Sequence, residues 1–340
     1  MSEFLKACRK EPTSFTPIWL MRQAGRYQAE YRAIRSKVSF IELCKNSDLA
    51  AEVTLLPVQQ FELDAAIVFA DILLVLEPLG VGFSFTKEGG PVIEEPLRDS
   101  KAIDRLKENI QAEHSLAYVM QTLKKVRQAL AGRIPLIGFS GAPFTLASYM
   151  IEGGGSRDYL HTKTLMYNDP AAFDVLMQKL SLAVIDYLKA QIKAGAQAVQ
   201  LFDSWVGCLS PRDYQRFVLP HMKKVFAALG DHVPVIHFST GNAALYPLMK
   251  EAGGHVIGID WRVDLAEQWE RLGDVALQGN LDPTFLLAPA DELKGAAKTI
   301  LDAANSRPGH IFNLGHGVLP PTSPDQVRML VDYVHEQSAR

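Results

Sequence analysis

Short runs of apolar residues recur along the whole chain and are separated by longer stretches with the apolar period of a helix. The runs lack apolar–polar alternation, which indicates strands that are buried on both faces. We predict strands at Ile18–Met21, Ala65–Phe69, Ile134–Phe139, Ala198–Phe202, Val233–Phe238, His255–Ile259, Val275–Gln278 and His310–Leu314. These make eight candidate strands in all.

Amphipathic stretches such as Pro170–Ala194 and Pro211–Leu229 lie between several of the runs and predict helices. Alternating strands and helices are typical of parallel βα units, and eight units are what a (β/α)8 barrel requires. We therefore predict an α/β fold with one barrel domain over residues 1–340. A doubly wound open sheet is the alternative, but it would normally carry a glycine-rich phosphate-binding motif, and no GxGxxG or P-loop sequence is present.

The residues that directly follow the apolar runs are polar or glycine, which is more than ordinary turn chemistry. In chain order these segments read MRQAGR, ADILL, SGAPFT, DSWVG, STGN, DWRVD, GNLDP and GHGV. A barrel collects its active site at the carboxyl ends of its strands. The sequence therefore predicts that the polar chemistry of this protein gathers at that end.

Charge and cysteine content exclude some kinds of binding partner and indicate the cellular compartment. The chain has 35 Lys plus Arg against 38 Asp plus Glu, so it has no general attraction to nucleic acid or to anionic membranes. Cys8, Cys44 and Cys208 form no CxxC pair, which argues against a disulfide framework or a thiolate metal site and favours the cytoplasm. The first residues lack the apolar segment of a signal peptide, and no long uncharged apolar stretch predicts a membrane span.

Two arginines four residues apart, Arg22 and Arg26, follow the first apolar run. A guanidinium binds carboxylates through two hydrogen bonds at once, so this pair suits a small molecule with several carboxylates. Gly25 would allow close approach of the backbone. The alternative is an exposed helical turn in which Arg26 pairs with Glu30, and the spacing alone leaves both interpretations open.

Two long motifs carry a resemblance to a known family. PIWLMRQAGRY at 17–27 and GFSGAPFTLASYMIEG at 138–153 resemble the two signatures of uroporphyrinogen decarboxylases. The resemblance continues in FADILL around Asp71, LFDSW around Ser204 and NLGHG around His316, so it spans nearly the whole chain. It implies a distorted (β/α)8 barrel, a cytoplasmic homodimer, and decarboxylation of the four acetates of uroporphyrinogen III to methyl groups. The product would be coproporphyrinogen III, formed in haem or chlorophyll synthesis without a metal or cofactor.

The same resemblance implies the site residues. Asp71 would accept hydrogen bonds from the pyrrole N–H groups and stabilise a cationic ring, while Arg22 and Arg26 would hold carboxylates during catalysis. The implied substrate-binding residues are Arg22, Gln23, Ala24, Gly25, Arg26, Asp71, Tyr149, Ser204 and His316. Arg35 and Phe202 lie near the matched motifs and are further candidates.

Local sequence offers a plainer interpretation of several of these residues. Asp71 could cap a helix that begins at Ile72, and Tyr149 could be a core tyrosine whose hydroxyl is satisfied. Ser204 could be a turn residue. The glycines beside His316 could serve a turn that leaves the histidine exposed. The other histidines, His237, His255 and His310 among them, have no spaced partners and are expected to be structural or surface residues.

Two other functions remain to be weighed. The first is a methyltransferase of the same fold, whose zinc site carries a His-x-Cys motif; this chain reads His237-Phe238-Ser239, so a soft ligand is missing there. The second is an inactive tetrapyrrole carrier that has kept the pocket, which the presence of Asp71 with Arg22 and Arg26 argues against.

Overall fold

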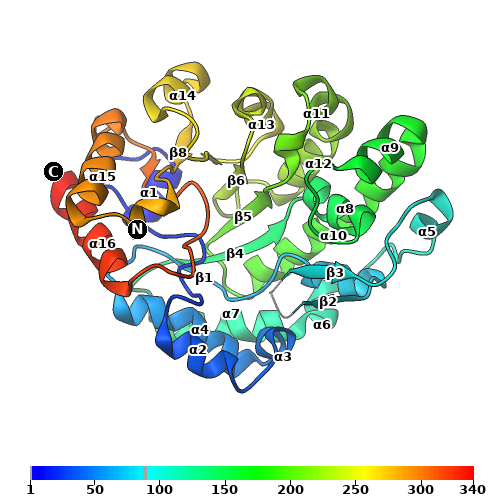
Figure 1. Cartoon of the computed structure of the whole chain (residues 1–340), viewed down its shortest axis with the longest axis horizontal. Coiled ribbons are helices and arrows are strands. Elements are labelled where there is room, and N and C mark those ends of the chain that lie inside the picture. The colour runs from blue at the N-terminus through cyan, green and yellow to red at the C-terminus, as the bar shows by residue number, and fades with distance from the viewer. Residues whose placement is uncertain (1, 87–89) are drawn as a thin grey trace.

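The structure is a computed structural model that describes residues 2–86 and 90–340. Seven parallel strands form one curled sheet, and helices cover its outside (Figure 1). In sheet order the strands are β1 (Ala66–Ile67), β4 (Leu136–Gly141), β5 (Ala198–Asp203), β6 (Val235–Ser239), β7 (Val256–Gly258), β8 (Ala276–Gln278) and β9 (His310–Ile311). A separate antiparallel hairpin, which the sequence pattern did not predict, pairs β2 (Phe83–Phe85) with β3 (Pro91–Ile93).

The helices pack around this sheet as the alternating pattern predicts. They are α1 (Glu3–Cys8), α2 (Ala29–Arg35), α3 (Phe40–Lys45), α4 (Ser47–Gln60), α5 (Ser100–Asp104), α6 (Ala112–Ser115), α7 (Ala117–Leu130), α8 (Pro143–Glu152), α9 (Leu160–Asn168), α10 (Pro170–Lys193), α11 (Pro211–Phe217), α12 (Leu219–Leu229), α13 (Tyr246–Ala252), α14 (Leu265–Leu272), α15 (Ala290–Ala304) and α16 (Pro324–Ser338). Short 3₁₀ helices are η1 (Leu74–Leu79), η2 (Val206–Cys208), η3 (Ala243–Leu245) and η4 (Pro283–Leu287).

The strands of the large sheet follow one another in space as they do in the chain. A doubly wound sheet reverses its strand order at a switch point, and this sheet has no reversal. The alternative of an open doubly wound sheet is therefore wrong. A consistent parallel order also places the carboxyl ends of all seven strands at the same end of the molecule, which we call the site end.

Hydrogen bonds across the interior show how strongly the sheet curls. The Nε2 atom of Gln278 in β8 donates to Oε1 of Gln200 in β5 at 3.0 Å, although two strands lie between them. The indole Nε1 of Trp19 donates to Oε1 of Gln278 at 2.9 Å. Around this polar chain the interior is apolar, with a cluster that includes Ile137 and Ile236. The concave face of the sheet is therefore a packed core and not a channel.

The prediction of a strand at Ile18–Met21 is wrong, because this segment forms only one parallel bridge, between Ile18 and Phe312. Side chains take the backbone donors that a ladder would need. The amide of Ile18 donates to the Asp64 carboxylate at 2.7 Å, and the amide of Met21 donates to the Asn313 side chain at 3.1 Å. The segment still has backbone bonds on both sides: Phe312 N donates to Pro17 O, and Asp64 N donates to Ile18 O, each at 2.9 Å.

The long helix predicted at Pro170–Ala194 is confirmed as α10, which Asp169 caps by accepting a hydrogen bond from the amide of Ala172. The helix predicted at Pro211–Leu229 is wrong as one element, because it is divided into α11 and α12 at Val218. Pro220 explains the break, since proline has no N–H to donate and its ring collides with the carbonyl four residues earlier.

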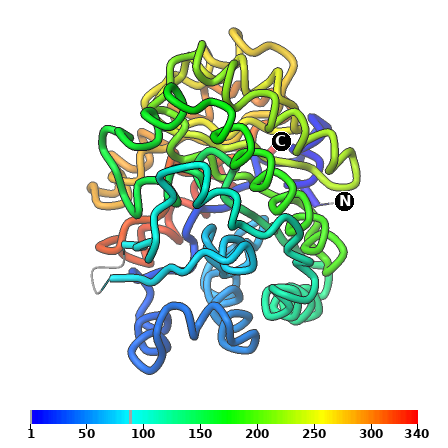
Figure 2. The backbone as a smooth tube through the Cα atoms, turned by 90° about the vertical axis from the view of Figure 1, so that its right-hand side faces the viewer, coloured from blue at the N-terminus to red at the C-terminus, as the bar shows by residue number. Residues whose placement is uncertain are grey.

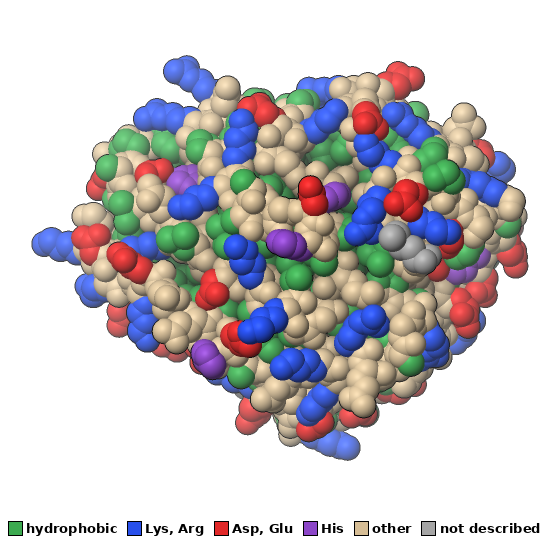
Figure 3. Space-filling model, turned by 180° about the vertical axis from the view of Figure 1, so that it is seen from behind, with side chains coloured by type: hydrophobic (Ala, Val, Ile, Leu, Met, Phe, Trp, Pro, Cys, Tyr) green, Lys and Arg blue, Asp and Glu red, His purple; other side chains and the backbone are tan. Residues whose placement is uncertain are grey.

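The two ends of the chain lie on the same side of the molecule in both views (Figures 1 and 2). A backbone hydrogen bond from Arg340 to Ser14 joins the two terminal segments. On the face shown in Figure 3, basic and acidic side chains are interspersed and do not form a field of one sign. Within the described residues, no helix has both the length and the apolar character to cross a membrane.

Candidate active site

Arg22 stands at the centre of the site end. Its backbone adopts the left-handed conformation with φ of 58°, which turns the chain directly after the first apolar run. The side chain is exposed, and its positive charge acts on Asp71, Tyr149 and His316, which come from three other segments. The structure therefore brings these four predicted residues together around one guanidinium.

Arg26 is also exposed, but it is not part of a helical turn that pairs it with Glu30. Helix α2 begins only at Ala29, and among residues 2–86 and 90–340 neither Arg22 nor Arg26 has an ion pair with an acidic group. The pairing of Arg26 with Glu30 is therefore wrong, although Arg26 does lie in an exposed turn. Two guanidinium groups that make no ion pair within the described residues can bind a ligand that carries carboxylates.

Asp71 follows β1 at the site end. One of its oxygens accepts a hydrogen bond from the Leu73 backbone amide at 2.8 Å. The capping interpretation is nevertheless wrong, because η1 begins at Leu74, not at Ile72, and its N-cap Leu73 makes no side-chain capping bond. Loss of water around the carboxylate raises the pKa of Asp71 to about 6, while the Leu73 amide and Arg22 act in the opposite direction. At neutral pH the group is mainly an anion that has little water and retains hydrogen-bonding capacity.

Tyr149 lies on α8, which starts directly after β4, and it is half-buried and not a core tyrosine. Its ring stacks on Trp205 with centroids 3.7 Å apart. Burial, together with the negative charge of Asp71, raises the pKa of Tyr149 to about 12, so its hydroxyl stays protonated and able to donate. Ser204 precedes Trp205 in the turn after β5, as the turn interpretation predicts, and it is half-buried too.

A buried hydrogen-bond chain holds that turn against α8. The hydroxyl of Thr145 donates to the carboxylate of Asp203 at 3.0 Å and accepts from the backbone amide of Trp205 at 3.3 Å. Thr145 and Asp203 are both fully buried. The ring of Trp205 stacks on that of Tyr149. The hydrogen-bond chain therefore positions two predicted site residues, Ser204 in the turn and Tyr149 on α8.

His316 is half-buried and not a freely exposed loop histidine. Burial lowers the pKa of His316 to about 4, and the nearby charges of Arg22 and Arg262 add to the effect. The imidazole is therefore neutral at physiological pH, with one nitrogen that donates and one that accepts. Its flanking glycines serve close packing: a Cβ on Gly315 would lie 2.3 Å from the Trp261 backbone nitrogen, and one on Gly317 would lie 2.4 Å from Cδ of Arg22.

The other residues of the first motif shape its loop. The side chain of Gln23 is 1% exposed and reaches the backbone of Leu20 and Ala65, so it holds the loop against β1. Ala24 and Gly25 are half-buried, and a Cβ on Gly25 would approach the Arg22 carbonyl oxygen to 3.4 Å. The backbone groups of Gly25 are already used within the loop, because its amide donates to Oε1 of Gln28 and its carbonyl accepts from the Gln28 amide, each at 3.0 Å.

The two further candidates lie at different depths. Phe202, at the end of β5, makes edge-on contacts with Phe139 at 5.5 Å and with Phe238 at 5.8 Å between ring centroids. These rings give the site end an apolar floor. Arg35 ends α2, where its guanidinium donates to the Val38 carbonyl and lies 6.0 Å from the Phe40 ring centroid. Arg35 therefore already has partners in the α2–α3 connection.

Sequence reasoning did not select a cluster that follows β7, formed by Asp260, Trp261 and Arg262. Asp260 is 1% exposed and forms an ion pair with Arg262 at 2.6 Å. The Arg262 guanidinium lies 3.9 Å above the Trp261 ring, and that ring meets His316 edge-on at 6.4 Å. The signal was present in the segment DWRVD after an apolar run, but no residue spacing distinguished it from a turn.

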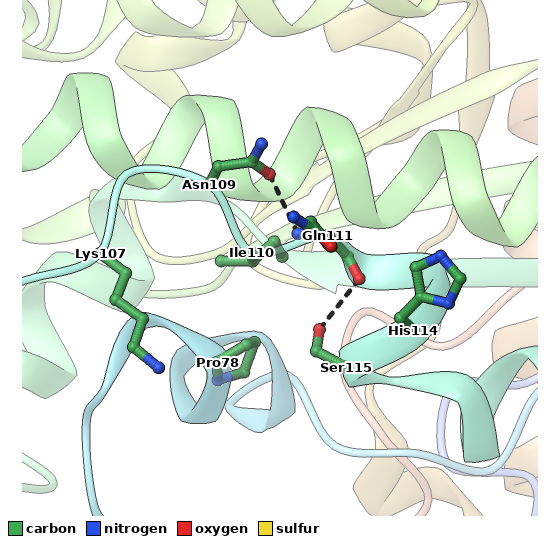
Figure 4. A pocket seen from close by; sticks show the side chains of 7 residues that line it. All are labelled: Pro78, Lys107, Asn109, Ile110, Gln111, His114 and Ser115. Atoms are coloured by element: carbon green, nitrogen blue, oxygen red, sulfur yellow. Dashed lines mark hydrogen bonds between the residues drawn. The ribbon is translucent and has the colours of Figure 1, made fainter.

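A separate hollow of about 410 Å³ does not coincide with these residues (Figure 4). It lies beside α6 and η1. There the Gln111 backbone amide donates to the Asn109 side chain, and the Ser115 hydroxyl donates to the Gln111 backbone carbonyl. Several of its polar groups are thus satisfied by one another. In the described part of the chain, no three or more His, Cys, Asp or Glu side chains lie close enough together to hold a metal.

Comparison with known proteins identifies the family. The family model described as "Uroporphyrinogen decarboxylase (URO-D)" matches residues 1–337. Proteins named uroporphyrinogen decarboxylase from Carboxydothermus hydrogenoformans and Koribacter versatilis are 54% and 52% identical, cover 99% and 100% of this chain, and are themselves covered over 96% and 97% of their lengths.

Among solved structures, a methyltransferase from Methanosarcina mazei aligns with a TM-score of 0.79 over 98% of both chains. At 19% identity this likeness shows a common fold and nothing about activity. A B12-independent methionine synthase from Shewanella is more distant, with a TM-score of 0.58, 10% identity, and coverage of 86% of this chain and 89% of that one. The full-length family match and the relatives above half identity are decisive: this chain belongs to the uroporphyrinogen decarboxylase family.

Proposed function

We propose that this protein removes carbon dioxide from the four acetate side chains of uroporphyrinogen III and so produces coproporphyrinogen III for haem or chlorophyll synthesis. The family match over residues 1–337 supports the activity. The structural observation that carries the mechanism is the placement of the Asp71 carboxylate beside Arg22, with a pKa raised to about 6 by burial. An anion in such surroundings is suited to stabilise a positive charge on a bound ring.

The substrate and the site end are complementary in charge. Uroporphyrinogen carries eight peripheral carboxylates and four pyrrole N–H groups. Arg22 and Arg26 have no internal ion pair among the described residues and can hold carboxylates, while the Tyr149 hydroxyl and one N–H of the neutral His316 ring can donate hydrogen bonds. Asp71 is the acceptor for the N–H groups in this proposal. The rings of Phe139 and Phe202 would lie under the macrocycle.

The reaction needs an electron sink, and the pyrrole ring itself provides one after it gains a proton on carbon. The bond between the acetate methylene and its carboxylate then breaks, carbon dioxide leaves, and the electron pair moves into the cationic ring. A proton added to the methylene carbon and a proton lost from the ring carbon restore the pyrrole. Each acetate therefore consumes one proton in total and becomes a methyl group.

In this sequence of steps Asp71 contributes most where the ring is cationic. A fixed anion with little surrounding water lowers the energy of that state without having to reorganise solvent. Arg22 and Arg26 act by holding carboxylates, because a guanidinium is a poor proton donor at its ordinary pKa. His316, neutral at physiological pH, orients a carboxylate or passes a proton.

The direct test is incubation of the purified protein with uroporphyrinogen, followed by chromatography of the products after oxidation. Successive products with seven, six, five and four carboxyl groups support the proposal, and unchanged substrate contradicts it and favours the inactive carrier. Because the ring is its own electron sink, we propose that no metal or organic cofactor is needed. Exhaustive chelation should leave the rate unchanged, whereas a loss restored by one metal would contradict this part.

The methyltransferase alternative has no support from the residues that it requires. His237 is fully buried, and its ring lies 5.2 Å from that of Phe226 on α12. Ser239, which stands where that motif has cysteine, donates a hydrogen bond to Sδ of Met249 at 3.0 Å. Both side chains are thus part of the packing between β6 and the helices.

We further propose a single domain over residues 1–340, in which the barrel closes through the segment around Ile18. The support is its pair of backbone bonds, one to the residue after β9 and one to Asp64 before β1. The family resemblance also leads us to propose a homodimer in the cytoplasm, and the free state of Cys8, Cys44 and Cys208 is compatible with a reducing compartment. Light scattering coupled to gel filtration tests the dimer.

A further inference from the structure

The turn after β7 presents an arginine in a fixed orientation. The buried Asp260 carboxylate accepts hydrogen bonds from the backbone amides of Gly241 at 2.6 Å and Arg262 at 3.0 Å. It also accepts from the Arg262 guanidinium at 2.6 Å. The carboxylate therefore joins the turns after β6 and β7 and holds one edge of the guanidinium.

A second contact fixes the plane of the same group. The guanidinium carbon of Arg262 lies 3.9 Å from the centre of the Trp261 ring, which is a close cation–π arrangement. Trp261 in turn packs on the loop that carries His316. The Trp261 backbone amide lies so close to Gly315 that a side chain at position 315 would not fit. Arg262 is thus held by Asp260 and Trp261, and its charge acts on His316.

Arg262 nevertheless remains half exposed, with 51% of its side chain accessible. A guanidinium has five N–H donors, and Asp260 takes one of them through Nη1. The guanidinium also lies within electrostatic reach of His316, since its charge contributes to lowering the pKa of that histidine, and the Trp261 ring contacts both residues. A preoriented fork with free donors loses little conformational entropy when it binds a carboxylate.

We propose that Arg262 is a third arginine of the substrate site, which binds a peripheral carboxylate of the substrate beside His316. This inference rests on the proposed function, because it names a further contact for the same substrate. It assigns the turn after β7 a share in recognising the many carboxylates of uroporphyrinogen, in addition to the loop of Arg22 and Arg26. The group acts by binding and takes no part in proton transfer.

The test compares three variants with the parent protein. Arg262→Gln removes the charge, and Arg262→Lys keeps an ion pair with Asp260 but loses the fork. Arg307→Gln is the matched control, because Arg307 lies 4.8 Å from the Trp269 ring and donates to the Gly273 carbonyl, just before β8 and so at the opposite end of the sheet. Melting temperatures of all variants report any damage to the fold.

We expect Arg262→Gln to raise KM for uroporphyrinogen by about 5- to 20-fold with kcat within about twofold, since one half-exposed charged contact is lost. Arg262→Lys should recover part of the affinity, and Arg307→Gln should match the parent. Quenching of tryptophan fluorescence by uroporphyrin, which has the same eight carboxylates, measures binding without turnover. The dissociation constant should rise by a similar factor.

Unchanged KM and unchanged uroporphyrin affinity in Arg262→Gln would overturn the inference while parental turnover leaves the proposed function in place. A parent that binds uroporphyrin but converts no uroporphyrinogen would instead refute the proposed function, and the binding constants alone would then decide the role of Arg262. A fall in melting temperature with no change in either constant would show that Arg262 only stabilises its turn.

Discussion

The Cα atom of Gly317 lies directly against the side chain of Arg22. A Cβ placed on Gly317 would be 2.4 Å from Cδ and 2.7 Å from Cγ of that arginine, much closer than real carbon atoms approach. The glycine after His316 therefore exists to let the Arg22 side chain pass. It couples the position of the first motif to the loop of the last one.

Gly317→Ala should consequently displace Arg22 without unfolding the protein, because a flexible side chain can move aside. We expect kcat/KM to fall by roughly 10- to 100-fold, the usual cost of moving a binding group by about 1 Å. Steady-state kinetics and a melting curve measure the two effects. Gly295→Ala is the control, since nothing lies within 4 Å of its Cβ position on α15, and parental kinetics are expected there.

Arg26→Lys keeps the charge but replaces a two-pronged donor with a single ammonium group. If Arg26 holds a substrate carboxylate, KM for uroporphyrinogen should rise by about 3- to 10-fold, with little change in melting temperature because Arg26 is exposed. Kinetics indistinguishable from those of the parent would return Arg26 to the ordinary protein surface.

Thr145→Val tests the buried chain that positions Trp205. Valine has nearly the shape of threonine but leaves the Asp203 carboxylate without the hydroxyl that donates to it at 3.0 Å. A buried acceptor that loses its donor costs about 1–3 kcal/mol, so the melting temperature should fall. KM should also rise, because the Trp205–Tyr149 stack loosens, whereas Thr145→Ser should retain most of the parental affinity. Equal kinetics for the valine and serine variants would limit the chain to a role in stability.

The expected pH dependence of kcat/KM follows from the ionisation of Asp71. The pKa of Asp71 is raised to about 6, so the anion on which the proposed mechanism relies is lost when the pH falls below that value. We expect kcat/KM, which reports the free enzyme, to decline about tenfold per unit below pH 6 and to level off above it. His316 titrates near pH 4 and adds no step between pH 6 and pH 8. A profile that stays flat down to pH 5 would separate activity from the charge of Asp71.

Sequence patterns predicted the architecture well where both faces of a strand are buried. Runs such as Ala198–Phe202 became strands because apolar residues on both sides leave no other stable arrangement. The Ile18 segment failed this prediction because its amides bond to the side chains of Asp64 and Asn313, and such pairings depend on residues distant in sequence. The break at Val218 was foreseeable from Pro220, whose effect the helical period concealed.

The proximity of the candidate site residues was predictable where they belong to long motifs, and less so where contacts are made across the fold. Arg22, Asp71, Tyr149 and His316 come together as their motifs imply. The roles of Gly315 and Gly317 could not be derived, since a glycine between two loops looks like a turn until the neighbouring loop is known. The contacts that hold Arg262 likewise could not be predicted from the sequence alone.

The proposed mechanism depends most on the negative charge of Asp71. The variant Asp71→Asn removes this charge and keeps the shape of the side chain. Asparagine keeps the shape and can still accept a hydrogen bond from the Leu73 amide and from a pyrrole N–H. Because the folded pKa of Asp71 lies above its unfolded value, the half-buried anion reduces stability as the pH rises through about 6. The variant should therefore melt at the same temperature as the parent or higher at pH 8, and not lower.

The decisive measurement is the single-turnover rate of uroporphyrinogen decarboxylation by Asp71→Asn at pH 7.5, beside its melting temperature in the same buffer. Loss of one preorganised charge opposite a cationic ring should reduce the rate by about 10²- to 10³-fold, while the protein remains folded and still binds uroporphyrin. A rate within a few-fold of the parent would contradict the proposed mechanism and would leave Asp71 as no more than an acceptor for the Leu73 amide before η1.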